Sequence, residues 1–205
     1  MNDKEIIFTD EQKEYLQEIM NIAYGRGTAA IADIIESFAK MAIPQITILK
    51  ATQLKEYLLT DEYKDQKCFL STQVLNGDIF GENLFIMNED SAKKLAHEFK
   101  IHTDITETIL SSIVLEITNI LSTTTIGKLA EELGTESYFE PPKIQTLENS
   151  TQLDETSFLD YKQVIAISTV LEFEQQKIYG KLMLLVTDDS ILWIQEAIDK
   201  IIAEF

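Results

Sequence analysis

Two short stretches of this sequence place a carboxylate and a carboxamide three residues apart. Glu18 precedes Asn21, and Glu116 precedes Asn119 at positions displaced by 98. Residues three apart on a helix share one face, so each pair would present both side chains together. A carboxylate can pair with a cation, and an amide can hold one water through its carbonyl and NH₂ groups. Each pair is a candidate reactive site, although a single Glu and Asn at this spacing are commonplace on a solvated helix.

The pattern extends beyond the two pairs in both copies. Pro44 follows Asn21 with 22 residues between them, and Pro142 follows Asn119 at the same spacing. We interpret both prolines as structural, because proline disfavours helix in the residue before it and precedes a strand here. The positions one turn before each Glu and one turn after each Asn share the same helix face: Glu14 and Gly25, then Ser112 and Thr123.

Other segments recur at nearly the same displacement. Ile79-Phe80-Gly81 matches Ile178-Tyr179-Gly180, and Glu89-Asp90-Ser91 matches Asp188-Asp189-Ser190, each 99 residues later. A constant spacing between several similar segments is typical of an internal repeat. We therefore predict a single domain, residues 1–205, made of an internal duplication with halves at about 9–99 and 104–205.

The first half is predicted to open with a long helix from a capping box at Thr9 to about Ala39. A strand at Gln45–Leu49 and a short helix at Gln53–Leu59 follow. Strands at 68–75 and 79–87 flank Asn76-Gly77-Asp78, a hairpin signal, and Asn88 begins a helix that runs through Glu98. The apolar face of the long helix is expected at Leu16, Ile19, Ile22, Ala23, Ala30, Ile34 and Phe38.

The second half repeats this order. A helix is predicted from Asp104 to Leu133, ending at Gly134, and a strand after Pro142. A polar loop at 149–157, strands at 164–173 and 177–186, and a final helix capped by Asp188-Asp189-Ser190 complete it. Two α-β-β-α halves predict an α+β fold, in which pseudo-symmetric halves share a largely antiparallel central sheet with the long site-bearing helices packed against it.

The composition excludes some classes of function. The net charge of −18, from 35 acidic and 17 basic residues, would repel nucleic acid and anionic membranes, although solubility alone also explains it. We expect no membrane insertion, since no run of eighteen apolar residues occurs. No signal peptide is recognised, and Cys68 is the only cysteine, so a cytoplasmic protein is expected. The sequence predicts no metal site of its own.

The extended pattern, Asp/Ser-x-x-x-Glu-x-x-Asn-x22-Pro, resembles the signature of the CheC/CheX/FliY family of chemotaxis phosphatases. These enzymes hydrolyse the aspartyl-phosphate of the response regulator CheY. The second copy matches fully, at Ser112, Glu116, Asn119 and Pro142. The first departs at Glu14, where the family has Asp or Ser. Length and duplication resemble CheC in particular.

The resemblance implies a role for each residue of the pattern. Asn21 and Asn119 would orient the attacking water, and Glu18 and Glu116 would pair with the active-site lysine of the receiver. The protein would need no cofactor of its own, because Mg²⁺ comes with the phosphorylated receiver. Four flanking residues would contact that receiver: Glu14, Gly25, Ser112 and Thr123.

Several alternatives stay open at this stage. Glu14 places a second carboxylate near Glu18, which would tighten or weaken docking depending on whether a lysine lies between them. Thr123 would crowd a docking receiver where Gly25 would not. We expect a monomer with both sites working. The alternative function is a non-catalytic module that sequesters phosphorylated CheY or the receptor deamidase CheD, and a flagellar-switch component is a third.

Overall fold

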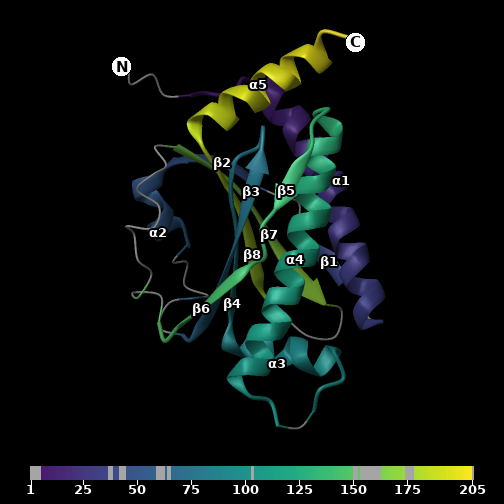
Figure 1. Cartoon of the computed structure of the whole chain (residues 1–205), viewed down its shortest axis with the longest axis vertical. Helices are drawn as coiled ribbons and strands as arrows, with labels where there is room; N and C mark the ends of the chain where they lie inside the picture. The colour runs from purple at the N-terminus through teal and green to yellow at the C-terminus, as the bar shows by residue number, and fades with distance from the viewer. Residues whose placement is uncertain are drawn as a thin grey trace.

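An eight-stranded antiparallel sheet carries two long helices, α1 and α4, on one face (Figure 1). The two helices lie side by side, and α5 and α3 lie at opposite ends of the molecule. The computed structural model describes residues 6–36, 39–41, 45–58, 63, 66–102, 104–149, 152, 163–173 and 178–204.

The elements follow the same order twice. The first series is α1 (Asp10–Ile35), β1 (Ala39–Met41), β2 (Gln45–Lys50), the 3₁₀ helix η1 (Ala51–Gln53), α2 (Leu54–Leu58), β3 (Cys68–Gly77), β4 (Gly81–Asn88) and α3 (Glu89–Glu98). The second is α4 (Glu107–Glu132), β5 (Ser137–Phe139), β6 (Lys143–Leu147), β7 (Gln163–Phe173), β8 (Gly180–Val186) and α5 (Asp188–Ile202). The short strands β1 and β5 were not predicted from the sequence.

Strands of the two series are interleaved in pairs across the sheet. The order is β1-β7-β8-β4-β3-β5, with β2 also paired to β7 and β6 also paired to β3. Each outer edge is therefore formed by two consecutive strands of one series laid along a long strand of the other. The series pair with each other at both edges and, through β4 and β8, at the centre.

The strand register has the form of a pseudo-two-fold arrangement. Gly81 of β4 pairs with Val186 of β8, and the pair displaced by 99 residues, Gly180 with Met87, is also formed. Both glycines are tightly packed: a Cβ at Gly81 would lie 1.9 Å from the Leu185 carbonyl oxygen. This register is what pseudo-symmetric halves require, and the duplication as the origin of the chain stays a prediction.

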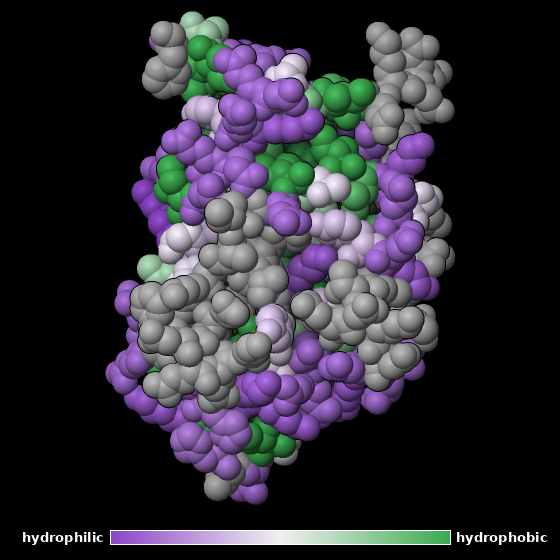
Figure 2. Space-filling view, turned by 180° about the vertical axis from the view of Figure 1, so that it is seen from behind, coloured by the Kyte–Doolittle hydropathy of each residue, from purple (hydrophilic) through white to green (hydrophobic). Residues whose placement is uncertain are grey.

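The sheet is buried on both faces. The larger apolar core lies between the sheet and the helices, where strand residues such as Phe69 and Phe85 pack with Leu16 of α1 and Leu121 of α4. The smaller core lies on the opposite face, beside α2, and includes Leu54, Tyr63, Cys68, Leu70, Leu84, Ile86, Leu147, Val164, Met183 and Leu185. Figure 2 shows the molecule from behind the view of Figure 1, where the coloured residues are mostly polar apart from an apolar area in the upper half.

The predicted helix starts are confirmed in the first half. The Thr9 side chain accepts a hydrogen bond from the Gln12 amide, and the Gln12 side chain accepts one from the Thr9 amide, which completes a capping box. Asn88 caps α3 through the Ser91 amide. The predicted cap of the last helix is wrong by one residue, because the side chain of Thr187 accepts from the Ser190 amide.

The predicted extent of the first helix was also wrong. It ends at Ile35 and not near Ala39, because Glu36 adopts a left-handed conformation with φ of 54°. Ile22 and Ile34 were expected on its apolar face but are 46% and 49% exposed, since that face turns toward α4 and the sheet through Leu16, Met20 and Ile31. Phe38, Pro44 and most of the predicted loop at 149–157 lie outside the described residues.

One helix in the described part of the chain, α4, is long and apolar enough to cross a membrane by length and composition. More than half of its most apolar window, 56%, is buried inside the molecule against neighbouring elements. It packs on α1, α3 and β3, and its buried apolar residues belong to the larger core. We therefore interpret α4 as a core helix that leaves one polar side exposed.

Candidate functional site

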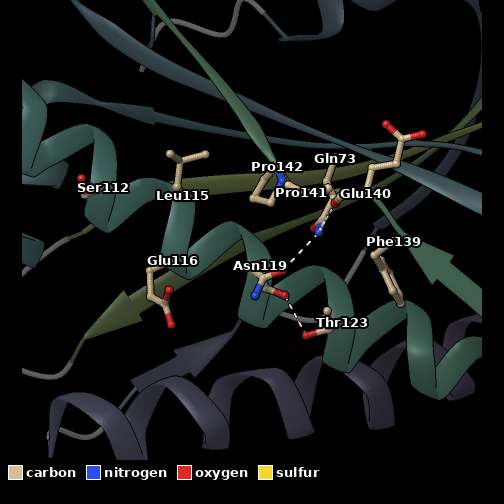
Figure 3. A pocket seen from close by; sticks show the side chains of 10 residues that line it. All are labelled: Gln73, Ser112, Leu115, Glu116, Asn119, Thr123, Phe139, Glu140, Pro141 and Pro142. Carbon is tan, nitrogen blue, oxygen red and sulfur yellow. Dashed lines mark hydrogen bonds between the residues drawn. The ribbon is translucent and has the colours of Figure 1, made fainter.

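The exposed side of α4 forms one wall of an open groove with a volume of about 630 Å³. Glu116 and Asn119 face this groove, with Ser112 and Thr123 one turn to either side (Figure 3). The opposite wall comes from β3 and from the segment that joins β5 to β6: Gln73, Phe139, Glu140, Pro141 and Pro142. The structure thus brings every predicted residue of the second copy together in one groove.

The exposed Asn119 is tethered at one end of its carboxamide. Its Oδ1 atom accepts a hydrogen bond of 3.2 Å from Nε2 of Gln73, which lies on β3 beneath the helix (Figure 3). The same Gln73 nitrogen donates to the backbone carbonyl oxygen of Glu140 at 2.9 Å. The Asn119 side chain is therefore held between helix and sheet with its NH₂ group directed away from Gln73.

The flanking hydroxyls are engaged with the helix backbone. Ser112 Oγ donates to the Thr108 carbonyl at 2.9 Å, and Thr123 Oγ1 donates to the Asn119 carbonyl at 2.7 Å. Hydroxyl donation to a carbonyl four residues earlier is a common way for such residues to fit a helix. Each oxygen keeps acceptor capacity toward the groove. Either residue would contact a docked protein as an acceptor more readily than as a donor.

Pro142 ends the connection that forms the far wall of the groove. It immediately precedes β6, as predicted, and β6 pairs with β3 from Lys143 to Leu147. Because two consecutive prolines fix the backbone there, the Glu140 carbonyl is held where Gln73 can donate to it. The carboxylate of Glu140 points away from the groove (Figure 3).

Gln73 is the site residue that sequence reasoning missed. It lies between Phe69 and Leu75 in the alternation of β3 that faces the larger core, and it is only 1% exposed. A buried carboxamide in phase with core residues was the available signal, since buried polar groups in native proteins normally serve a hydrogen bond. Its partner Asn119 is 46 residues away, so the sequence did not reveal the contact.

The first copy lies on the exposed side of α1. Glu14, Glu18, Asn21 and Gly25 are all exposed along it, and a Cβ atom at Gly25 would meet no atom within 4 Å. Tyr15, beside Glu14, has its pKa raised by partial burial and by the carboxylates of Glu132 and Glu18. The segment that would correspond to the Pro141–Pro142 wall includes Pro44, which lies outside the described residues.

In the part of the chain that the structure describes, no group of three His, Cys, Asp or Glu residues is arranged to hold a metal ion. The groove on α4 carries one carboxylate that faces it, Glu116, and no described cation lines it. Its chemistry is therefore that of a carboxylate, a carboxamide and hydroxyl oxygens. Such a set can dock a cation and hold a water molecule.

Comparison with solved structures identifies the fold. FliY of Thermotoga maritima matches with a TM-score of 0.76 at 19% identity, over 95% of this chain and 99% of that chain. The FliM middle domain of H. pylori matches with a TM-score of 0.61 at 12% identity, over 93% and 99%. CheX of Vibrio vulnificus matches with a TM-score of 0.52 at 14% identity, over 82% and 98%.

No protein-family model matches the sequence. A closest relationship to CheC, expected from length and duplication, stays a prediction. Likeness at these identities concerns the backbone, and it agrees with the predicted α+β class and antiparallel sheet. The chain has the fold of the CheC/CheX/FliY chemotaxis proteins, which the middle domain of FliM shares.

Proposed function

We propose that this protein hydrolyses the aspartyl-phosphate of a CheY-type receiver domain in cytoplasmic chemotaxis signalling. Asn119 would orient the attacking water, and Glu116 would pair with the active-site lysine of the receiver. The observation that carries the proposal is the tethered Asn119 carboxamide beside an exposed Glu116 in one open groove. The fold supports a chemotaxis protein, and the activity is our inference.

The proposed reaction requires little covalent chemistry from the protein itself. The water oxygen forms a bond to phosphorus while the bond from phosphorus to the aspartate oxygen breaks, which yields a free carboxylate and inorganic phosphate. An acyl phosphate is already activated, so a water held in line accounts for much of the acceleration. The amide cannot accept the water's proton as a base, so that proton leaves with the phosphate product. The receiver's own Mg²⁺ would neutralise the phosphoryl oxygens.

The shape and charge of the groove favour a protein substrate. The groove is shallow and open, and it lies along an exposed helix, which suits insertion of α4 against a receiver surface. The net charge of −18 would attract a partner whose active site presents a lysine. Glu18 and Asn21 on α1 present the same residue types, so we extend the proposal to a second, weaker site there.

The deciding experiment follows the decay of a phosphorylated CheY-type receiver from the same organism. Wild-type protein is expected to speed the decay, Asn119→Ala to lose most of the effect, and Asn21→Ala to lose the smaller part. The double variant should leave only the receiver's own rate. If the double variant speeds decay as well as wild type does, the Asn mechanism is wrong.

A second candidate function is binding without turnover. The likeness to the FliM middle domain favours it, because that match is as extensive as the match to CheX. In that case the protein would sequester a phosphorylated receiver, or the deamidase CheD. Calorimetric titration with a beryllofluoride-activated receiver separates the two: tight binding without any acceleration of decay would favour the binding module.

A further inference from the structure

The buried side chain beneath the groove, Gln73, makes two hydrogen bonds with one nitrogen. Nε2 donates to Asn119 Oδ1 at 3.2 Å and to the Glu140 carbonyl oxygen at 2.9 Å. An amide NH₂ group has two protons, so these two acceptors use its full donor capacity. Gln73 therefore links α4, β3 and the proline segment at the point where Asn119 projects.

The polarity of this link is fixed by chemistry. Nitrogen and oxygen of a carboxamide can exchange places, and most such assignments depend on the neighbours. Here one neighbour is a backbone carbonyl, which can only accept, so the end of Gln73 that faces Glu140 must be the NH₂ group. The same NH₂ faces Asn119, so Asn119 must present Oδ1 to it. The Nδ2 group of Asn119 is consequently the end left for the groove.

Stability alone does not explain this arrangement. The Oε1 atom of Gln73 and the Oδ1 atom of its cross-strand neighbour Asn83 are buried without a hydrogen-bond partner among the described residues. Asn83 uses its Nδ2 to donate to Ser122 Oγ at 2.6 Å. An unpaired buried acceptor destabilises the folded state, because it gives up its hydrogen bonds to water. Gln73 is kept at such a cost and contacts Asn119, which suggests a role beyond packing.

Around the first site, the described residues provide no counterpart of the Gln73 carboxamide. The register relates β3 to β7 by 96 residues, because Gln73 pairs with Asn83 as Thr169 pairs with Leu182. Thr169 thus occupies the backbone position of Gln73, and threonine has no carboxamide. Leu182 stands in place of Asn83.

Tyr24 stands in place of Ser122, 98 residues earlier, and both Tyr24 and Leu182 are buried. Among the described residues, a buried carboxamide that contacts the Asn of the pattern therefore occurs at the second site only.

We infer that Gln73 is a positioning residue of the second site. It acts through Asn119, whose Nδ2 it turns toward the groove and whose rotation it restricts. Nδ2 can then donate a hydrogen bond to the attacking water, and the remaining lone pair of Oδ1 can accept a hydrogen bond from that water. The first site lacks this support among the described residues, and it turns over more slowly. This inference rests on the proposed function.

The test uses Gln73→Met, which keeps length and flexibility and removes both donors. Measurements are made in the Asn21→Ala background, so that only the second site contributes. We expect the kcat for receiver dephosphorylation to fall about 10–100-fold, the range that a small misplacement of a reacting group produces. KM for the phosphorylated receiver should stay unchanged, because Glu116 still docks it. A variant that merely unfolds would lose receiver binding as well as turnover.

Asn83→Leu is the matched control. It removes a neighbouring buried carboxamide that does not contact Asn119, and it installs leucine, the residue found at the equivalent position 182 of the second half. We expect unchanged kcat and an unchanged or higher urea midpoint. Equal kcat for Gln73→Met and its parent, in a protein whose activity still depends on Asn119, would overturn the inference and leave the proposed function intact.

A second measurement is independent of activity. The side-chain NH₂ protons of Gln73 should exchange slowly with solvent in NMR spectra, and the Asn119→Ala variant should speed that exchange. If wild-type protein leaves the receiver's decay unchanged, the proposed function fails while the exchange result still tests the contact. Rapid exchange in wild type would contradict the contact directly.

Discussion

Gly27 of α1 lies so close to Thr124 of α4 that a Cβ atom on Gly27 would sit 3.0 Å from the Thr124 hydroxyl oxygen. Leu121 Cδ2 and Thr125 Cγ2 would each lie 3.3 Å from that Cβ atom. The two helices that carry the candidate sites therefore meet at this glycine. Their separation, and with it the placement of both exposed faces on the sheet, depends on the lack of a side chain there.

Adding a side chain at Gly27 is expected to destabilise the fold. Gly27→Leu should lower the free energy of unfolding by about 1–3 kcal/mol, as overpacking does in tightly packed interiors. Gly25→Ala is the control on the same helix: the added methyl meets nothing within 4 Å, and it should raise stability by up to about 1 kcal/mol. Urea unfolding followed by circular dichroism measures both. Equal effects at the two glycines would show that the helix contact is looser than described.

Neutralising the groove carboxylate is expected to weaken docking more than turnover. Glu116→Gln should raise KM for the phosphorylated receiver about tenfold, the loss expected for a charge-assisted hydrogen bond. The effect should shrink at high salt, which screens the lost attraction. Glu196→Gln, an equal change of charge on the exposed side of α5, serves as the control. A shift of the same size in both variants would indicate long-range steering alone.

The ion pair at the start of α4 predicts a dependence of stability on pH. Lys67 Nζ lies 2.7 Å from Glu107 Oε2 and 3.5 Å from Glu148 Oε1, and the hydrogen bond from Lys67 holds the pKa of Glu107 below its usual value. A carboxylate with a lowered pKa stabilises the fold above its unfolded pKa, and this contribution is lost as pH falls through the folded pKa. Lys67→Met should therefore lower the urea midpoint at neutral pH and have little effect near pH 3. An equal loss at both values would mean that packing of the lysine chain dominates.

The buried thiol of Cys68 can report local opening of the folded protein. Burial on the α2 side of the sheet raises the pKa of Cys68 to about 11. Stability should fall as pH rises above the unfolded value of about 8.5, because the unfolded chain then releases a proton that the folded chain keeps. Labelling by a disulfide reagent at pH 8 should be very slow and should speed up with urea. Rapid labelling of the native protein would show that this face opens locally.

The sequence predicted local features well. The capping box at Thr9, the cap at Asn88 and the hairpin around Gly77 all depend on residues within a few positions of one another, and all three occur. The helix that ends at Ile35 was predicted too long because a left-handed Glu36 is not favoured by any local signal. Apolar periodicity also placed Ile22 inside, although polar neighbours on α1 face the same side.

The site was predicted only on its helix side. Glu116, Asn119, Ser112 and Thr123 follow from helical spacing, and the groove contains all four. The wall across from them arises from strand pairing, which brings Gln73 under Asn119 through contacts that have no sequence period. The candidate site residues on the helix could thus be predicted from the sequence, whereas Gln73, which contacts one of them, required the fold.

The interleaved sheet constrains how the chain reaches its native state. Gln45 of β2 pairs with Ser168 of β7, 123 residues later, and β4 lies against β8 at the centre. During synthesis, the N-terminal strands emerge from the ribosome well before the strands that must flank them. Closing such long loops is slow, and unpaired edges stay open to other chains meanwhile. The complete sheet can therefore form only after nearly the whole chain has been made, and until then the early strands lack the neighbours that will cover their edges.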